Sequence, residues 1–334
     1  MDDLVPATLP VVTTLGRIAA ARPWLAALPT LIAEVREQFG VRLGAPWHAG
    51  SCSWVAPAVL PDGTAAVVKI GWPHREMYGE PVALRRWAGR GAVRLLAHDP
   101  ARHALLLERC EPGTPLSAVD GPATARLRAG AAVLRRLWSV SPPDGPAATG
   151  APVVERLGDV TAEWAELTQA RMDRLRPGYD PGLVAEGVAL LRALPGSAGR
   201  TVLLHGDANP GNILAHTAVP DSGSAVRRGP DGGQPRLADV AQWRAIDPKP
   251  MVGDPAYDPW PLLEQIDDPF GRDDAVAVLR ERVALLADEL ELSAERIAQW
   301  AVARRVEAAL WTAAHGDVPD GATDMARARI LAAW

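Results

Sequence analysis

The segment His205-Gly206-Asp207-Ala208-Asn209-Pro210-Gly211-Asn212 carries the most specific pattern in this sequence of 334 residues. Apolar residues at 202–204 precede it and Ile213-Leu214 follows it, so it is predicted to be a loop between two buried strands. A capped turn is the structural alternative. The spaced triple of His, Asp and Asn arises by chance in only about a few such sequences per thousand, so we interpret the loop as a functional one.

An Asp followed five positions later by an Asn is typical of the catalytic loop of kinases. In that chemistry the Asp accepts the proton of the attacking hydroxyl, and the Asn oxygen binds a magnesium ion that bridges the ATP phosphates. The spacing therefore predicts Asp207 as a catalytic base and Asn212 as a metal ligand. We expect His205 to brace the loop rather than to bind a metal, because the seven histidines show no metal-ligand spacing.

A second metal ligand is predicted in Ala245-Ile246-Asp247-Pro248-Lys249-Pro250, where Asp247 follows an apolar run downstream of the loop. Two oxygen ligands, completed by phosphates and waters, suit Mg²⁺. Lys249 has three candidate roles that the sequence does not separate. It could contact a phosphate, pair with Asp258, or cap a turn.

Lysine is rare in this chain, and Lys69 and Lys249 are its only two examples. Lys69 lies near the end of a predicted strand at 64–70, where an unpaired buried ammonium would be costly. We expect it to contact the α- and β-phosphates of ATP and to pair with a helix glutamate, either Glu76 or Glu80.

The segment Gly50-Ser51-Cys52-Ser53 separates two strand-like stretches upstream of Lys69. Backbone N–H groups in such a loop can bind phosphate, so Gly50, Ser51 and Ser53 are candidate nucleotide contacts. The segment lacks a complete Gly-x-Gly-x-x-Gly pattern, and a plain turn is the alternative. Phosphate-loop, nucleophile-elbow and His-Glu-x-x-His motifs are missing from the sequence.

The predicted secondary structure changes from mainly strands to mainly helices near residue 112. Before it, strand-like stretches alternate with a helix expected at 30–39, with Thr30 as its N-cap, and a short one at 81–87. After Pro112-Gly113, which we expect to break the strand pattern, helices are predicted near 180–194, 274–290 and 293–314, with surface loops at 141–152 and 217–235. The prediction is an α+β, bilobal, protein-kinase-like fold with a small N-lobe at 1–112, a hinge at 108–112 and a helical C-lobe at 113–334.

Composition excludes several classes of protein. With 35 Lys+Arg against 40 Asp+Glu, the net charge of −5 argues against nucleic-acid binding. Cys52 and Cys110 are too few for a disulfide framework, and no apolar run reaches the roughly 18 residues of a membrane helix. The acidic start, Met1-Asp2-Asp3, is unlike a secretory signal. We expect a cytoplasmic monomer with no membrane or nucleic-acid partner.

The catalytic segment, together with 245–258, resembles the aminoglycoside phosphotransferase superfamily. Within it, the resemblance is greatest to the aminoglycoside/hydroxyurea antibiotic resistance kinases, the group of the streptomycin 6-kinases. Val68-Lys69-Ile70-Gly71-Trp72-Pro73-His74 and Gly89-Arg90-Gly91-Ala92-Val93-Arg94-Leu95-Leu96 also resemble that group, and the resemblance runs from about residue 45 to about 320.

The resemblance implies a role for each motif residue. Asp207 would be the base, Asn212 and Asp247 the Mg²⁺ ligands, and Lys69 the phosphate anchor. Leu105-Leu106-Leu107-Glu108-Arg109-Cys110 is similar to the family's hinge, where backbone groups of Glu108 and Cys110 would hold the adenine of ATP. Glu80 matches the family's helix glutamate, but Gly79 and Pro81 flank it, which leaves Glu76 as the alternative. Ala208-Asn209 stands where the family usually has Leu-His, which alters the acceptor-site wall.

The implied reaction is ATP-dependent phosphorylation of a small-molecule hydroxyl, here the 6-hydroxyl of a streptomycin-type aminoglycoside, giving antibiotic resistance. A polycationic acceptor would be attracted to carboxylates. Those that follow the predicted metal site are Asp254, Asp258, Glu264, Asp267 and Asp268. A solvated face or a set of helix N-caps explains such a cluster equally well, and Asp258 in particular could brace the catalytic loop.

Two rival functions remain. The same chemistry could act on hydroxyurea, another antibiotic or a metabolite. A nucleotide-binding pseudokinase is the other rival, and the presence of Lys69, Asp207, Asn212 and Asp247 together argues against it. A protein kinase is disfavoured because no peptide-docking activation segment follows Asp247.

Overall fold

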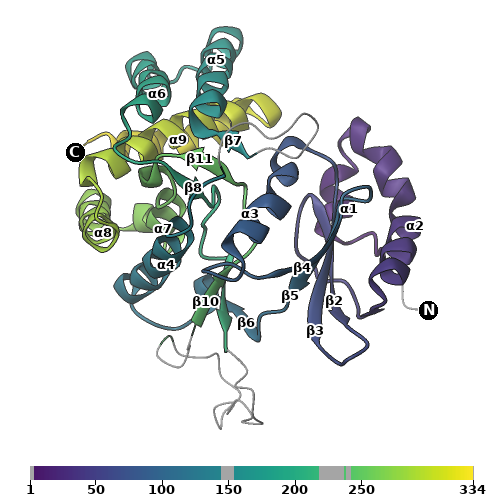
Figure 1. The fold of residues 1–334 in the computed structure, drawn as a ribbon. Coiled ribbons are helices and arrows are strands. Elements are labelled where there is room, and N and C mark those ends of the chain that lie inside the picture. The colour runs from purple at the N-terminus through teal and green to yellow at the C-terminus, as the bar shows by residue number, and fades with distance from the viewer. Residues whose placement is uncertain (1–3, 144–153, 218–236, 238–241, 334) are drawn as a thin grey trace.

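The computed structural model describes residues 4–143, 154–217, 237 and 242–333. Apart from 141–143 and 217, the predicted loops at 141–152 and 217–235 lie outside the described residues. The described chain forms two lobes, as predicted: one sheet flanked by the N-terminal helices, and a larger helical unit beside it (Figure 1). No helix in the described ranges is long and apolar enough to cross a membrane.

The N-lobe is built on a five-stranded antiparallel sheet. Its strands, in spatial order, are β1 (Arg42–Leu43), β2 (Ser53–Val59), β3 (Ala65–Gly71), β5 (Ala104–Glu108) and β4 (Leu95–Asp99). The β-branched and leucine side chains of β3 and β5 explain why these strands occupy the buried centre. Lys69 lies on β3, in register with Leu105 of β5.

Two helices pack on the N-lobe sheet. Helix α2 (Arg22–Phe39) buries Leu28, Ile32 and Val35 in a cluster with Trp54 and Ile70 of the sheet. Helix α3 (Glu80–Trp87) buries Leu84 and Trp87 in the other cluster, which continues into the C-lobe. In Figure 1, α2 lies on the outer side of the sheet and α3 lies between the sheet and the C-lobe.

The predicted start of the helix at Thr30 is wrong. Helix α2 begins at Arg22, with Pro23 in its first turn, and Pro29 lies inside it. Proline is well tolerated in a first turn, where its missing N–H has no helical partner, and one interior proline is accommodated here by the packing of α2 on the sheet. A further helix, α1 (Pro10–Leu15), precedes it.

Two small sheets hold the segments between the lobes. Strand β9 (Ile213–His216) pairs with β10 (Gln242–Ala245) and with β6 (Pro112–Pro115), so Pro112 begins a strand rather than ending the strand pattern. Strand β11 (Met251–Gly253) pairs with β8 (Val202–Leu204) and, in parallel, with β7 (Glu155–Arg156). The segment 205–212 therefore joins one small sheet to the other.

The C-lobe is helical. Its helices are α4 (Ala123–Trp138), α5 (Leu157–Leu175), α6 (Pro181–Ala193), α7 (Trp260–Gln265), α8 (Ala275–Leu290), α9 (Ala294–His315) and α10 (Val318–Leu331). Helix α9 is central and contacts α5, α6, α8 and α10. The helix predicted near 180–194 is confirmed as α6, and Asp180 is its N-cap, since the Asp180 side chain accepts hydrogen bonds from the amides of Gly182 and Leu183. The starts of α8 and α9 agree with prediction to one residue, whereas α7 and α10 were not predicted.

Candidate active site

The segment 205–212 forms a tight loop held by its own side chains. Asn209 Oδ1 accepts hydrogen bonds from the amides of Gly211 (2.9 Å) and Asn212 (3.1 Å), while its Nδ2 donates to Asp207 Oδ1 (3.0 Å). Asn212 Nδ2 donates to the carbonyl oxygen of Asp207 (3.0 Å). The loop therefore fixes Asp207 and Asn212 relative to each other.

The buried carboxylate of Asp258 braces the start of this loop. Its carboxylate accepts hydrogen bonds from the amides of His205 (2.9 Å) and Gly206 (2.8 Å) and from Trp138 Nε1 (2.9 Å), and the residue is 1% exposed. Burial raises the pKa of this carboxyl group, although the three donors oppose the rise. Asp258 therefore lies where it can brace the loop, which is the structural alternative that the sequence left open.

His205 also supports the loop from the protein interior. Its ring stacks on Trp87 with centroids 6.2 Å apart, and its Nε2 lies 3.1 Å from the carbonyl oxygen of Ile246. Burial lowers the pKa of the imidazole, which favours the neutral ring. The loop of Asp207 is thus tied to the segment after β10 that carries Asp247.

Lys69 lies between two carboxylates. Its Nζ is 2.7 Å from Glu80 Oε2 and 2.5 Å from Asp247 Oδ1, and the residue is 8% exposed. Burial lowers the pKa of the ammonium, but the charges of Asp247 and Glu80 outweigh burial and hold it above its usual value. The Lys69 charge in turn lowers the pKa of Asp247. Both Lys69 and Asp247 are therefore charged.

Glu80, and not Glu76, is the partner of Lys69. Glu80 is the first residue of α3, and Pro81 lies in the first turn of that helix, where proline starts a helix rather than shortening it. Glu76 belongs instead to the 3₁₀ turn η2 (Arg75–Tyr78), and its Oε2 lies 3.8 Å from Lys249 Nζ.

A cavity of about 670 Å³ lies between the N-lobe sheet and the β9–β10 hairpin. Apolar side chains form two of its walls, with Val67 and Leu107 from the sheet and Leu214 and Ile246 from the hairpin side. The polar positions expected to contact nucleotide or metal also line it: Gly50, Ser51, Ser53, Lys69, Glu80, Glu108, Cys110, Asn212 and Asp247. Burial raises the pKa of the Cys110 thiol to about 12, so its side chain is a neutral thiol.

Asn212 and Asp247 form a donor set that fits Mg²⁺. The amide of Ile246 donates to the carbonyl oxygen of Asn212 (2.9 Å), which brings the two segments together at one end of the large cavity. Because the Asn212 amide nitrogen is bound to Asp207, the oxygen of that carboxamide is the atom that can bind a cation. An amide oxygen and an ionised carboxylate are hard ligands, which magnesium prefers.

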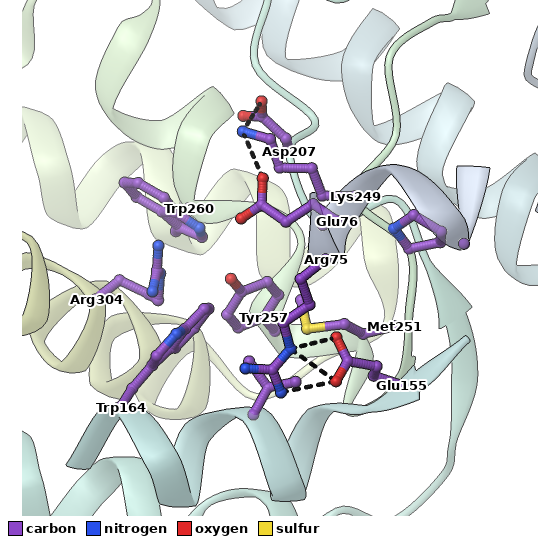
Figure 2. Close-up of a pocket in the computed structure, with 14 residues that line it drawn as sticks. Arg75, Glu76, Glu155, Trp164, Asp207, Lys249, Met251, Tyr257, Trp260 and Arg304 are labelled. Atoms are coloured by element: carbon purple, nitrogen blue, oxygen red, sulfur yellow. Dashed lines mark hydrogen bonds and ion pairs between the residues drawn. The ribbon is translucent and has the colours of Figure 1, made fainter. Parts of the chain in front are cut away.

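A second cavity, of about 140 Å³, lies beside Asp207 (Figure 2). Its lining residues include Arg75, Glu76, Glu155, Trp164, Asp207, Lys249, Met251, Tyr257, Trp260 and Arg304. The Arg304 guanidinium lies 4.1 Å from the ring centroid of Trp164 and 5.4 Å from that of Trp260. Sequence reasoning missed this group, because Trp164 belongs to no recognised motif and Arg304 is one arginine among many.

Glu155 and Glu163 bind Arg75 at the edge of this cavity. Arg75 Nε lies 2.8 Å from both carboxylate oxygens of Glu155, and its Nη1 pairs with Glu163. These contacts join the N-lobe turn η2 to β7 and α5 of the C-lobe.

The acidic cluster expected to bind the acceptor has other partners. Buried Asp254 accepts hydrogen bonds from Trp300 Nε1 (2.6 Å) and Arg296 Nε (2.6 Å), and buried Glu264 pairs with Arg305. Exposed Asp267 pairs with Arg126, Asp268 caps a 3₁₀ turn, and Asp258 holds the loop. Among the described residues that line the two cavities, none belongs to this cluster. The observed partners of Asp254, Asp258, Glu264 and Asp267 are those that the N-cap and structural alternatives predict, and they give no support to acceptor binding by these residues.

Known proteins resemble this chain over most of its length. Residues 44–316 match the family model described as aminoglycoside/hydroxyurea antibiotic resistance kinase. The chain is 33% identical to a streptomycin 6-kinase of Streptomyces glaucescens, over 93% of this chain and 89% of that protein. It is 34% identical to a hydroxyurea phosphotransferase of Kitasatospora aureofaciens, over 98% of this chain and 85% of that protein.

Solved structures show the same fold at low identity. The choline kinase LicA from Streptococcus pneumoniae aligns with a TM-score of 0.58 at 15% identity, covering 91% of this chain and 100% of that one. An amicoumacin kinase aligns with a TM-score of 0.59 at 14% identity, covering 91% and 92%. The fold is the bilobal kinase-like one, and the chain belongs to the aminoglycoside/hydroxyurea antibiotic resistance kinase family.

Proposed function

We propose that this protein transfers the γ-phosphoryl group of ATP, with Mg²⁺, to the 6-hydroxyl of a streptomycin-type aminoglycoside. The observation that carries the proposal is the position of Asp207, which lines the small cavity while Asn212 and Asp247 line the adjoining large one. A base at the acceptor and metal ligands at the nucleotide is the arrangement that phosphoryl transfer requires. The streptomycin 6-kinases at 32% and 33% identity support the choice of acceptor.

Each residue has a defined task in this proposal. Asp207 accepts the proton of the attacking hydroxyl, and Lys69, held by Glu80, neutralises the α- and β-phosphates. Asn212 and Asp247 would hold Mg²⁺, which supplies charge neutralisation at the phosphates when bound. Backbone groups at Glu108 and Cys110 would hold adenine between the apolar walls. We also propose residue 112 as the boundary between an N-lobe at 1–112 and a C-lobe at 113–334.

Hydroxyurea is the second candidate acceptor, and the small cavity favours it. The cavity measures about 140 Å³, and its charged lining residues balance, with Arg75, Lys249 and Arg304 against Glu76, Glu155 and Asp207. A small neutral molecule suits such a site without rearrangement. An aminoglycoside would need Arg75 to release Glu155 and Glu163, whose carboxylates could then contact cationic groups of the acceptor.

Mass spectrometry of each acceptor, incubated with purified protein and Mg·ATP, tests the proposal. A mass gain of one phosphoryl group on streptomycin, present with Asp62→Ala and lost with Asp207→Ala, is the expected result. Asp62 is a suitable control because it lies in an exposed hairpin turn. A mass gain on hydroxyurea alone would show that hydroxyurea, rather than streptomycin, is the acceptor. ATP binding with no phosphorylation of either compound or of a panel of antibiotic and metabolite hydroxyls would favour the pseudokinase.

A further inference from the structure

Lys249 lies at the junction of the two cavities. It lines both of them, as does Glu76. Its Nζ is 3.1 Å from Asp207 Oδ2 and 3.8 Å from Glu76 Oε2, and Figure 2 shows this ammonium beside the Asp207 carboxylate at the top of the small cavity. Any group that passes from a nucleotide in the large cavity to an acceptor beside Asp207 must come close to this charge.

The backbone of Lys249 is fixed against the catalytic loop. Its amide donates to the carbonyl oxygen of His205 (2.8 Å), and Pro248 and Pro250 restrict the chain on either side. The Cα of Lys249 therefore has little freedom, and the ammonium can move only through its own side-chain torsions. Its reach covers the space around Asp207 and Glu76.

The catalytic loop supplies no cation of its own. Residues 205–212 contain neither lysine nor arginine, and Asn209 uses its amide to hold Asp207. The ammonium of Lys69 is already bound by Glu80 and Asp247. Negative charge on the transferring phosphoryl oxygens needs a nearby donor in the transition state. Lys249 is placed to supply it from the acceptor side.

We infer that Lys249 is a catalytic residue that leaves Asp207 and binds the transferring phosphoryl group. The inference rests on the proposed function. In the step, the acceptor oxygen forms a bond to the γ-phosphorus, the bond from that phosphorus to the β–γ bridging oxygen breaks, and ADP leaves. The hydroxyl proton passes to Asp207, while Lys249 keeps all its protons. The ammonium thus exchanges its contact with the Asp207 carboxylate for one with the γ-phosphoryl oxygens.

The affinities of two nucleotides distinguish a catalytic role of Lys249 from a purely structural one. We would measure the dissociation constants of Mg·ADP and of Mg·AMP-PNP, which carries a γ-phosphoryl group, for wild type, Lys249→Met, Lys249→Arg and the exposed control Arg17→Met. The expected result for Lys249→Met is an affinity for Mg·AMP-PNP that is about 10-fold weaker, with Mg·ADP affinity within about 2-fold of wild type. Equal changes in the two dissociation constants, or no change in either, would overturn the proposed contact between Lys249 and the γ-phosphoryl group.

Single-turnover transfer supplies a second measurement. Lys249→Met should slow phosphoryl transfer roughly 100-fold at saturating nucleotide, and Lys249→Arg should recover part of the rate because it restores a cation. Equal rates for Lys249→Met and wild type would contradict a catalytic role. If wild type phosphorylates neither acceptor, the proposed function fails by itself, and the comparison of ADP with AMP-PNP still decides whether Lys249 contacts the γ-phosphoryl group. Lys249→Arg keeps the test valid if the methionine variant does not fold.

Discussion

Gly206 and Lys249 are in such close backbone contact that a β-carbon on residue 206 would lie 1.9 Å from the carbonyl oxygen of Lys249. Gly206 also has a φ of +80°, a conformation that favours glycine. The contact packs the loop of Asp207 directly against the segment that carries Asp247. The relative position of Asp207 and Asp247, the proposed base and metal ligand, therefore depends on a residue with no side chain.

Gly206→Ala should separate these two segments. The clash is with backbone and cannot be relieved by a rotamer change, so we expect unfolding free energy to fall by about 1–3 kcal/mol and turnover to fall at least about 100-fold. Urea unfolding and steady-state kinetics measure the two effects. Gly199→Ala is the matched control, since nothing lies within 4 Å of a β-carbon there. An active, stable Gly206→Ala enzyme would show that the contact is not required.

Glu80→Gln should weaken nucleotide binding through Lys69. The variant leaves the buried ammonium with Asp247 as its remaining carboxylate partner, so Asp247 is drawn away from its proposed role as a metal ligand. We expect about 1–3 kcal/mol of destabilisation and weaker Mg·ATP binding, measured by urea unfolding and calorimetry. Glu76→Gln should change the unfolding free energy by less than about 0.5 kcal/mol, because Glu76 is exposed. A larger loss of stability for Glu76→Gln than for Glu80→Gln would instead indicate that Glu76 is the partner of Lys69.

Asp258→Asn tests bracing against acceptor binding. The carboxylate accepts three N–H donors, and an asparagine amide would turn a donor toward at least one of them. We expect a loss of about 1–3 kcal/mol in stability and a lower kcat with little change in acceptor KM. Asp267→Asn, on an exposed carboxylate, should cost less than about 1 kcal/mol. A rise in acceptor KM alone would instead place Asp258 in the acceptor site.

Glu264 predicts a pH dependence of stability. Burial raises the pKa of Glu264 from 4.5 to about 7, despite the charge of Arg305. Between those two values the folded protein binds more protons than the unfolded chain, so this group makes the free energy of unfolding fall as pH rises from about 4.5 to about 7.

Glu264→Gln removes that titration. The stability of the variant relative to wild type should therefore rise by about 3 kcal/mol between pH 4.5 and 7 and stay constant above. Urea unfolding at a series of pH values measures the difference, with the exposed Glu186→Gln as control. A flat difference across the range would mean that Glu264 is ionised throughout.

Arg75→Ala should distinguish the two candidate acceptors. Removing the guanidinium enlarges the small cavity and exposes the carboxylates of Glu155 and Glu163. For a cationic aminoglycoside we expect KM to fall, by about 3-fold or more, because a competing cation is gone. For neutral hydroxyurea we expect KM to stay constant or rise. Parallel steady-state assays with both compounds decide between these outcomes.

The sequence by itself determined which short segments would contribute to the large cavity, the proposed nucleotide side of the site. The loop at 205–212, the Lys69 strand and the 105–110 hinge are each short segments, and their chemistry follows from residue types at fixed local spacing. Hydrophobic periodicity also located the main C-lobe helices, because a helix with one buried face shows its 3.6-residue repeat. The change from strands to helices near residue 112 was enough to predict two lobes.

The proposed acceptor side was decided only by the tertiary structure. Its small cavity joins Arg75, Glu155, Trp164, Trp260 and Arg304, which come from separate elements of both lobes. The sequence could not separate the two explanations of the acidic cluster, because a carboxylate's partner depends on what packs against it from distant segments, as Arg296 and Trp300 do on Asp254. Local spacing fixes which groups a loop presents, whereas long-range packing fixes which charges are buried, which are paired, and which face the substrate.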